Sequence, residues 1–133
     1  MRSSVADLRS AMFGAEPALQ GLVAEFASEY AGMSLFFQSY STWNGRQGVY
    51  VQDIFVEPRF RGQGVGDRLL RHIAALTRAR GGTYMRLAVD VRNFSAMRFY
   101  TRLGLVHSDT EQIHAAYDET FDALADAAEL EEK

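Results

Sequence analysis

The stretch EPRFRGQGVGDRLLRH, residues 57–72, decides the fold because it joins an apolar run to a helix-like pattern through a glycine-rich turn. Three glycines fall within five positions: Gly62, Gly64 and Gly66. The apolar run VYVQDIFV comes immediately before this stretch and predicts a strand. Pro58 cannot donate to a sheet ladder, so it ends that strand. The order of strand, glycine-rich turn and helix predicts a β-α unit.

The rest of the chain continues this alternation of strands and helices. Apolar residues at helical spacing predict a helix from Val65 to about Arg80, ended by two glycines. Upstream we expect a short helix over 5–12 and three strands, over 18–26, 31–40 and 48–56. A turn near 27–30 joins the first strand to the second, and a hairpin at Asn44-Gly45 joins the second to the third. Downstream we expect a strand over 83–91, a helix over 95–103, a strand pair over 105–109 and 111–117, and an acidic helical tail over 118–133. This pattern predicts an α/β or α+β fold.

The composition describes an ordinary globular chain. Its 133 residues are 47% hydrophobic and predict one domain, residues 1–133. The absence of cysteine excludes disulfides, thiolate nucleophiles and cysteine zinc sites. A net charge of −3 disfavours a nucleic-acid partner, and no apolar run is long enough to span a bilayer. We therefore expect a cytoplasmic protein with no membrane partner.

A glycine-rich turn at the start of a helix is also an anion site. The first N–H groups of a helix lack internal acceptors, and the helix dipole is positive at that end. Glycines let the backbone approach a phosphate, and Arg59 and Arg61 add cationic side chains. A plain tight turn is the alternative interpretation. A Walker loop requires G-K-[ST] and a Rossmann loop requires G-x-G-x-x-G, and RGQGVGDR fits neither.

A third phosphate-loop pattern does fit. The spacing R-x-x-G-x-G, formed by Arg61, Gly64 and Gly66, resembles the acyl-CoA pyrophosphate loop of the GNAT superfamily of N-acetyltransferases. NFSAMRFYTRLGL, residues 93–105, resembles the second cofactor motif of that family, N-x-x-A-x-x-F-Y-x-x-x-G-[FL]. The resemblance extends from about Asp7 to the end of the chain. FFQSYSTWNGRQGVYVQDIFVEPRFRGQGVG, residues 36–66, looks most like the diamine and polyamine acetyltransferase branch.

The resemblance implies a GNAT fold, with a mixed and mostly antiparallel central sheet flanked by helices, and acetyl-CoA as the co-substrate. Tyr100 matches the tyrosine that donates a proton to the departing CoA thiolate; a core aromatic is its alternative role. Three strand residues would bind pantetheine through their backbone: Ile54, Phe55 and Val56. Seven loop residues would hold the pyrophosphate: Arg61, Gly62, Gln63, Gly64, Val65, Gly66 and Asp67. Asn93 and Ser95 would contact the pantetheine arm or its surroundings.

Two departures from the branch affect the acceptor side. The branch usually has Glu-Asp where this chain has Gln52-Asp53, the two candidate substrate-binding residues. A carboxylate at the first position would act as base and hold a cationic amine, whereas glutamine does not accept a proton usefully. Adjacent strand residues face opposite sides, so Asp53 does not automatically replace it. Asp53 can still bind a cation, or it is a solvated strand carboxylate.

The second departure lies before the first predicted strand. Family members usually begin with a further strand and helix, which we expect to be missing here, so we expect the strand over 18–26 to be an edge strand open to pairing. Either a partner subunit replaces the missing elements, which predicts a homodimer, or the sequence is a truncated reading of a longer gene. Aromatic residues that would line an acceptor cleft or pack in the core are Phe36, Phe37, Tyr40 and Trp43. No metal site is expected at the histidines His72, His107 and His114.

Three functions therefore stay open. The first is an N-acetyltransferase that acts on a primary amine of a small molecule, with a diamine, polyamine or lysine-like acceptor. The second is a GNAT enzyme with another acceptor, such as a peptide N-terminus or an aminoglycoside. The third is an acyl-CoA-binding module with weak or no turnover, which Gln52 favours and Tyr100 disfavours.

Overall fold

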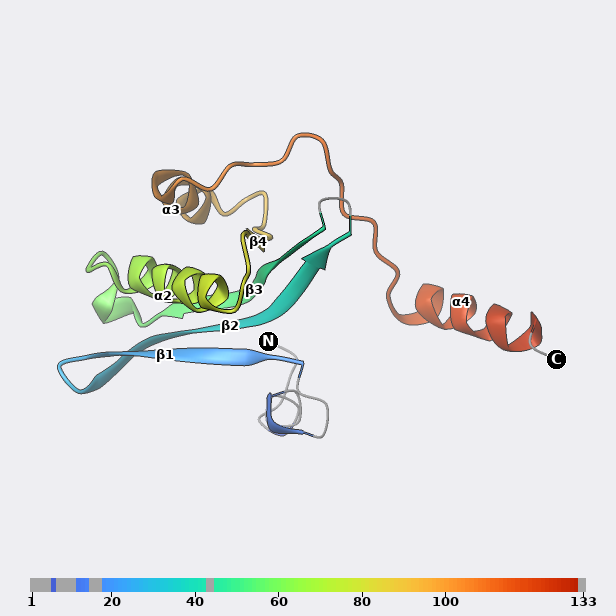
Figure 1. The fold of residues 1–133 in the computed structure, drawn as a ribbon, viewed down its shortest axis with the longest axis horizontal. Helices are drawn as coiled ribbons and strands as arrows, with labels where there is room; N and C mark the ends of the chain where they lie inside the picture. The colour runs from blue at the N-terminus through green and yellow to red at the C-terminus, as the bar shows by residue number, and fades with distance from the viewer. Residues whose placement is uncertain (1–5, 7–11, 15–17, 43–44, 132–133) are drawn as a thin grey trace. The chain divides into compact units, whose positions relative to one another are not determined.

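A four-stranded sheet organises the first of the two units into which the chain divides, residues 1–99 and 100–133. The computed structural model describes residues 6, 12–14, 18–42 and 45–131. The strands are β1 (Gln20–Phe26), β2 (Glu29–Ser41), β3 (Arg46–Val56) and β4 (Met85–Leu87), and they lie in that order across the sheet (Figure 1). β1, β2 and β3 pair antiparallel, and β4 pairs parallel to β3. The expected mixed, mostly antiparallel sheet is confirmed.

The turn between β1 and β2 consists of two residues. Ala27 and Ser28 have φ values of 52° and 66°, and Phe26 pairs with Glu29 across the turn. Two successive left-handed residues give the tight hairpin turn whose twist matches that of the flanking strands. The predicted turn near residues 27–30 is confirmed, although neither residue is glycine.

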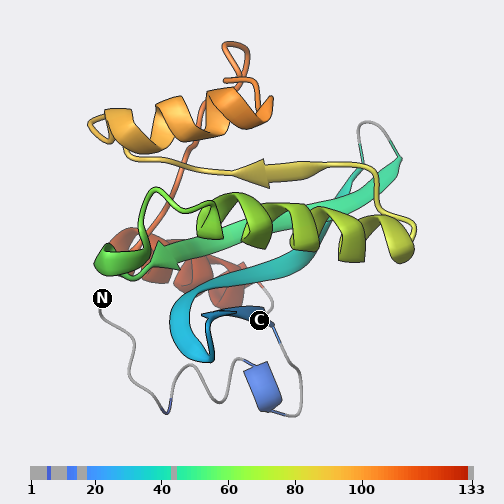
Figure 2. The same ribbon diagram turned by 90° about the vertical axis from the view of Figure 1, so that its left-hand side faces the viewer.

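Helix α2 (Val65–Ala79) covers one face of the sheet (Figure 2). Its buried side chains are Val65, Leu69, Leu70 and Ile73. Leu69 and Val65 pack with Ala31 and Phe60 in one core cluster, which partly buried residues of β1 and β3 extend. The predicted helix is confirmed, and its amphipathic pattern explains which side faces the sheet.

The strand predicted directly after α2 is shorter than the sequence indicates. We expected a strand over 83–91, whereas β4 contains only Met85–Leu87. The Asp90 carboxylate accepts a hydrogen bond from the backbone N–H of Arg92 at 2.8 Å and also pairs with its side chain. A side chain that bonds its own backbone competes with a strand ladder, so the chain turns there.

The predicted strand pair over 105–109 and 111–117 is wrong. The structure shows no regular secondary structure over residues 105–117. Two of the apolar residues in this segment, Val106 and Ile113, are 91% and 82% exposed, and six polar residues separate them. A two-stranded hairpin without a buried face is marginal in water, so this pattern is too weak to form one.

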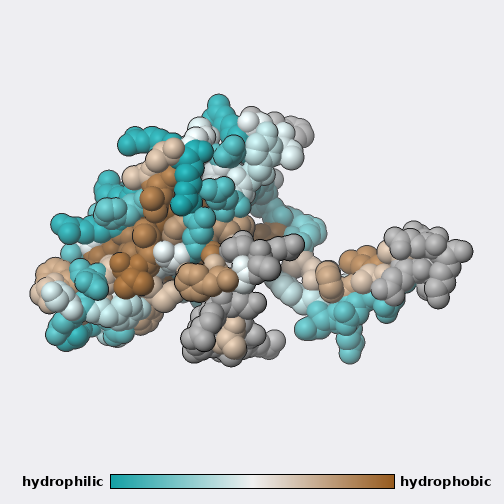
Figure 3. Space-filling view, turned by 60° about the horizontal axis from the view of Figure 1, so that its bottom comes forward, coloured by the Kyte–Doolittle hydropathy of each residue, from teal (hydrophilic) through white to brown (hydrophobic). Residues whose placement is uncertain are grey.

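The helical predictions near the C-terminus are confirmed. Helix α3 (Phe94–Leu103) begins in the first unit and ends in the second, and α4 (Asp118–Glu131) lies in the second. Hydrophobic side chains gather on one side of α4 and hydrophilic ones on the other (Figure 3). Within the described part of the chain, no helix combines the length and apolar character needed to cross a membrane.

Some predictions fall on residues outside the described ranges. The helix expected over 5–12 lies almost entirely there, and so do Trp43 and Asn44. Gly45, next to Asn44, has a φ of 64° in the connection between β2 and β3.

Candidate active site at the glycine-rich loop

The glycine-rich loop lies between a short 3-10 helix, η1 (Pro58–Phe60), and the first turn of α2. Gly62 and Gly64 have φ values of 80° and 82°, a conformation that L side chains rarely adopt. A Cβ atom on either glycine would meet no atom within 4 Å, so the backbone conformation alone requires glycine there. Gly64 is the N-cap of α2 and offers no side chain to the helix amides.

The loop and the first turn of α2 present a row of unused N–H groups. Arg68 N–H donates to the carbonyl of Gly64 at 3.0 Å, which is the first hydrogen bond of α2. In the part of the chain that the structure describes, no backbone N–H between Gly62 and Asp67 donates to a protein acceptor. Such groups at the positive end of a helix dipole are typical of phosphate sites. The seven predicted pyrophosphate residues therefore lie together on one loop and helix terminus.

The end of β3 leaves one backbone edge open beside this loop. β4 pairs with β3 only from Val49 to Val51, whereas β2 continues to pair with β3 as far as Val56. Glu57 N–H donates to Ala31 of β2 at 2.8 Å. Because successive strand residues direct their backbone groups to alternate edges, those of Ile54 and Val56 face away from β2.

Arg61 connects this open edge to the loop. Its Nε donates to the carbonyl oxygen of Val56 at 3.1 Å, and the side chain is exposed. Gln63 Nε2 donates to the carbonyl of Arg59 at 3.4 Å, which folds the loop back on η1. The Asp67 carboxylate pairs with Arg71 one turn along α2. The Arg61 guanidinium thus lies where the strand edge and the row of amides meet.

Gln52 and Asp53 lie at an irregularity of β3. The register with β2 shifts so that Leu35 faces Asp53 and Phe36 faces Val51, which leaves Gln52 as the extra residue of a β-bulge. Ser34, which is fully buried, donates its hydroxyl to the Asp53 carbonyl at 2.7 Å. Both candidate acceptor residues have exposed side chains. No glycine marks the bulge, so the sequence carries no signal for it.

The second motif forms the start of α3. Asn93 accepts a hydrogen bond from Ala96 N–H at 3.1 Å through Oδ1, so its side chain caps the helix. Its amide Nδ2 remains a donor, and Ser95 in the first turn is exposed. A Cβ on Gly66 would lie 3.2 Å from the ring of Phe99, so the small residue allows close packing between α2 and this part of α3.

Tyr100 is the next residue along α3 and is partly buried. Burial raises its pKa above the ordinary value of 10.0. A phenol with a raised pKa keeps its proton throughout the neutral range, which is the state required of a general acid.

Among the aromatic and histidine candidates, some are packed in the fold and others are exposed to solvent. Phe36 is buried in the core, and Phe37 stacks on Tyr50 with ring centroids 5.2 Å apart, so both have structural roles. Tyr40 is 59% exposed. The side chain of His72 is exposed on α2, His114 is exposed, and His107 lies 3.3 Å from the Asp109 carboxylate on the surface.

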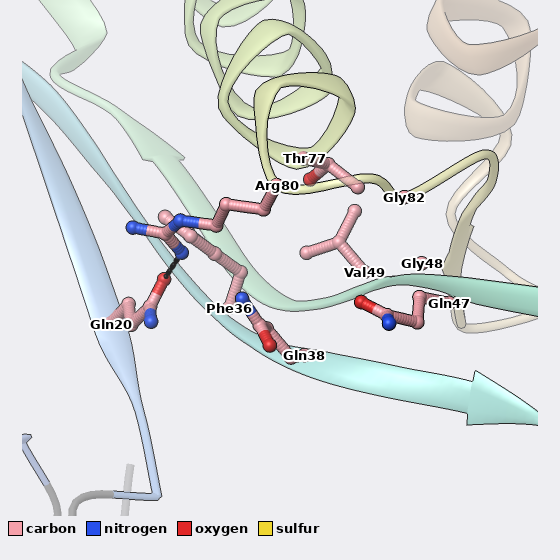
Figure 4. Close-up of a pocket in the computed structure, with 9 residues that line it drawn as sticks. All are labelled: Gln20, Phe36, Gln38, Gln47, Gly48, Val49, Thr77, Arg80 and Gly82. Atoms are coloured by element: carbon pink, nitrogen blue, oxygen red, sulfur yellow. Dashed lines mark hydrogen bonds between the residues drawn. The ribbon is translucent and has the colours of Figure 1, made fainter.

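A small pocket lies at the opposite end of α2, away from the glycine loop. Arg80, Thr77, Phe36 and Val49 line it, and Arg80 donates to the side-chain oxygen of Gln20 at 2.6 Å (Figure 4). None of the residues predicted to bind the cofactor, bind the substrate or act in catalysis lines this pocket, whereas Phe36, an aromatic candidate for the acceptor cleft, does. Sequence reasoning did not find it, because its lining comes from three strands and a helix end.

Comparison with known proteins identifies relatives in sequence and in fold. Thialysine N-epsilon-acetyltransferase of Bos taurus is 39% identical over 105 residues, which are 73% of this chain and 61% of that protein. The Mus musculus protein of the same name is 38% identical with the same coverage. The chain spans less than two thirds of the length of these relatives. An integron cassette protein from the mobile metagenome of V. cholerae has the same fold, with a TM-score of 0.80, 19% identity, and coverage of 92% of this chain and 78% of that one.

A family model provides the last comparison. Residues 3–105 match the model of the acetyltransferase (GNAT) family. The matched range contains the glycine loop, the open edge of β3 and the whole of α3. The chain therefore belongs to the acetyltransferase (GNAT) family.

Proposed function

We propose that this protein transfers the acetyl group of acetyl-CoA to a primary amine of a small acceptor. The observation that carries the proposal is the junction between the open β3 edge and the unused amides from Gly62 to Asp67. An extended amide chain such as pantetheine pairs with a strand edge, and a pyrophosphate pairs with the N-terminus of a helix. One molecule, an acyl-CoA, offers both groups.

The proposed residues have separate tasks. The backbone groups of Ile54 and Val56 bind pantetheine, whereas those of Phe55, which lies between them, face β2. The amides from Gly62 to Asp67 bind the pyrophosphate together with the Arg61 side chain, because the Arg61 N–H already donates to Pro58. Asn93, through Nδ2, and Ser95 contact the pantetheine arm. These assignments are supported by the family match and by the positions of the groups.

The reaction is direct attack of the amine on the thioester. The neutral amine nitrogen forms a bond to the carbonyl carbon, and the carbon–sulfur bond breaks. The thiolate takes a proton from the Tyr100 hydroxyl, the acetylated amine loses a proton to solvent, and the Tyr100 phenolate takes a proton back from solvent. Tyr100, whose pKa burial raises, is protonated when the thiolate leaves.

For the acceptor, we propose a lysine-like or diamine compound, including polyamines. The names of the relatives support this class, and the exposed Asp53 carboxylate provides a partner for a cationic amine. A panel of diamines, lysine analogues, aminoglycosides and peptides in a thiol-release assay tests the choice. If only peptides or aminoglycosides caused thiol release, the proposed acceptor class would be wrong.

A second candidate function is an acyl-CoA-binding module with little turnover. Gln52 favours it, because a carboxamide at the bulge cannot take the proton of an ammonium acceptor. Calorimetry with acetyl-CoA followed by the thiol-release assay separates the two functions. Binding without release for any amine supports the module.

We also propose that the chain works as a single-domain homodimer in the cytoplasm. The described part of β1 forms one edge of the sheet, and Val23 on that strand is 66% exposed. An edge strand with exposed apolar side chains is a surface for association. Sedimentation of the protein tests the proposal, and a monomer at all concentrations would contradict it.

A further inference from the structure

The two ends of the glycine loop are held in the hydrophobic core. Phe60 precedes the loop and Val65 follows it, and each side chain is 7% exposed. Both belong to one core cluster with Ala31 and Leu69. The residues between them, 61–64, are exposed, so the position of the loop depends on how its two buried ends are held.

The tip of the β1–β2 hairpin covers the outer side of Phe60. The rings of Phe26 and Phe60 lie 5.5 Å apart between centroids. Arg59 lies 4.7 Å from the Phe60 ring centroid, and its guanidinium pairs with the Glu29 carboxylate at 3.0 Å. We call these four residues, Phe26, Glu29, Arg59 and Phe60, the hairpin–loop contact.

Two hydrogen bonds connect this contact to the glycine loop, one from a side chain and one between backbone groups. The carbonyl of Arg59 accepts the Gln63 side-chain amide, and Arg61 N–H donates to Pro58 at 3.2 Å. The tight turn at Ala27 and Ser28 places Phe26 directly opposite Glu29, so the two side chains project from neighbouring positions at the tip of the hairpin. Side-chain contacts and hydrogen bonds therefore connect the hairpin tip to the glycine loop, although about 30 residues separate them in sequence.

We propose that the hairpin–loop contact preorganises the glycine loop for its anion, and that Phe26 and Glu29 are positioning residues for cofactor binding. The inference rests on the proposed acetyl-CoA site. It assigns Arg59 to the hairpin and not to the pyrophosphate, because its guanidinium already faces Glu29 and the Phe60 ring. Ordering a loop before binding lowers the cost of ordering it on binding, so loss of the contact weakens affinity.

The test compares acetyl-CoA binding by calorimetry in Phe26→Ala and Glu29→Gln with wild type. Loss of an aromatic pair corresponds to a rise in Kd by a factor of about 2 to 12. Loss of an exposed ion pair corresponds to a rise by a factor of about 1.4 to 5. We expect the Kd to rise within these ranges and kcat at saturating acetyl-CoA to stay unchanged. Phe26→Tyr, which keeps the ring, should restore the wild-type Kd, and so should the exchange Glu29→Arg with Arg59→Glu.

Matched controls come from the same hairpin. Glu25→Gln removes one exposed carboxylate from β1 and Val23→Ala removes an exposed apolar side chain, and neither belongs to the contact. Neither should raise the Kd. If Glu29→Gln tightens binding relative to Glu25→Gln, Arg59 is a direct anion ligand and the inference is wrong. Unchanged affinity in both contact variants also overturns it.

A second readout does not need the ligand. Phe60 N–H donates to Glu57 at 2.9 Å, and with Arg61 N–H it reports the order of η1. Both amides should exchange with solvent faster in Phe26→Ala than in Val23→Ala. If wild type does not bind acetyl-CoA, the proposed function fails, and this exchange rate alone decides whether the hairpin orders the loop. Equal exchange in the two variants would overturn the inference.

Discussion

At the residue scale, we propose the Tyr100 hydroxyl as the proton donor of the reaction. Tyr100→Phe removes one oxygen and keeps the ring, so acetyl-CoA binding should persist. Loss of a general acid lowers kcat by a factor of about 10² to 10⁴. Steady-state kinetics and calorimetry on one preparation measure both quantities. Tyr84→Phe is the matched control, because the Tyr84 hydroxyl bonds Ser39 in the sheet, and a similar loss of kcat there would contradict the assignment.

The pH dependence of the same residue follows from its raised pKa. Burial disfavours the charged phenolate, so the acid form persists above pH 10. We expect no loss of kcat from this group between pH 7 and 10, and a decline only at higher pH. The profile of Tyr100→Phe should lack that alkaline decline. A decline centred between pH 7 and 9 that disappears in the variant would show a lowered pKa, opposite to the prediction.

Gly64 is a residue whose left-handed backbone shapes the glycine-rich loop. Its φ of 82° is left-handed, so Gly64→Ala should reduce the free energy of unfolding by about 1 to 2 kcal/mol and weaken acetyl-CoA binding. Gly81→Ala is the control, because Gly81 has a φ of 89° at the other end of α2 and equally open surroundings. Thermal unfolding and calorimetry should show similar destabilisation in both variants. An equal loss of acetyl-CoA affinity in Gly81→Ala would show that the loss follows from lower stability and not from the shape of the loop.

At the element scale, Asn93 separates the stability of α3 from ligand binding. Asn93→Ala removes the N-cap and should cost about 1 kcal/mol of unfolding free energy. Asn93→Asp keeps the cap oxygen and loses the Nδ2 donor, so it should keep the stability and weaken acetyl-CoA binding. Chemical denaturation and calorimetry give the two values. Wild-type affinity in Asn93→Asp would reduce Asn93 to its capping role.

The elements that the sequence predicts well are those with strong local patterns. Helix α2 has an amphipathic period, an N-terminal glycine turn and C-terminal glycines, and it lies where expected. The three antiparallel strands carry long apolar runs. The strand pair expected over 105–117 has only a few apolar residues, divided by the polar run from 107 to 112, and that pattern cannot tell a strand from an extended loop.

The candidate site was predictable as residues but not as geometry. The glycine spacing predicts the loop because a left-handed backbone and an open helix terminus are local properties. The bulge at Gln52, the end of β4 pairing at Val51 and the contact between Phe26 and Phe60 depend on register between distant segments. Register is set by tertiary packing, so a single sequence does not reveal it.

At the scale of the whole molecule, acetyl-CoA should occupy the junction of loop and strand within residues 1–99. The most direct measurement is a titration of the labelled protein with acetyl-CoA followed in its ¹H–¹⁵N NMR spectrum. We predict the largest shifts at the amides from Gly62 to Asp67 and at Ile54 and Val56, with small shifts at the Arg80 pocket. Shifts confined to other residues, or none at millimolar acetyl-CoA, would contradict the proposed site.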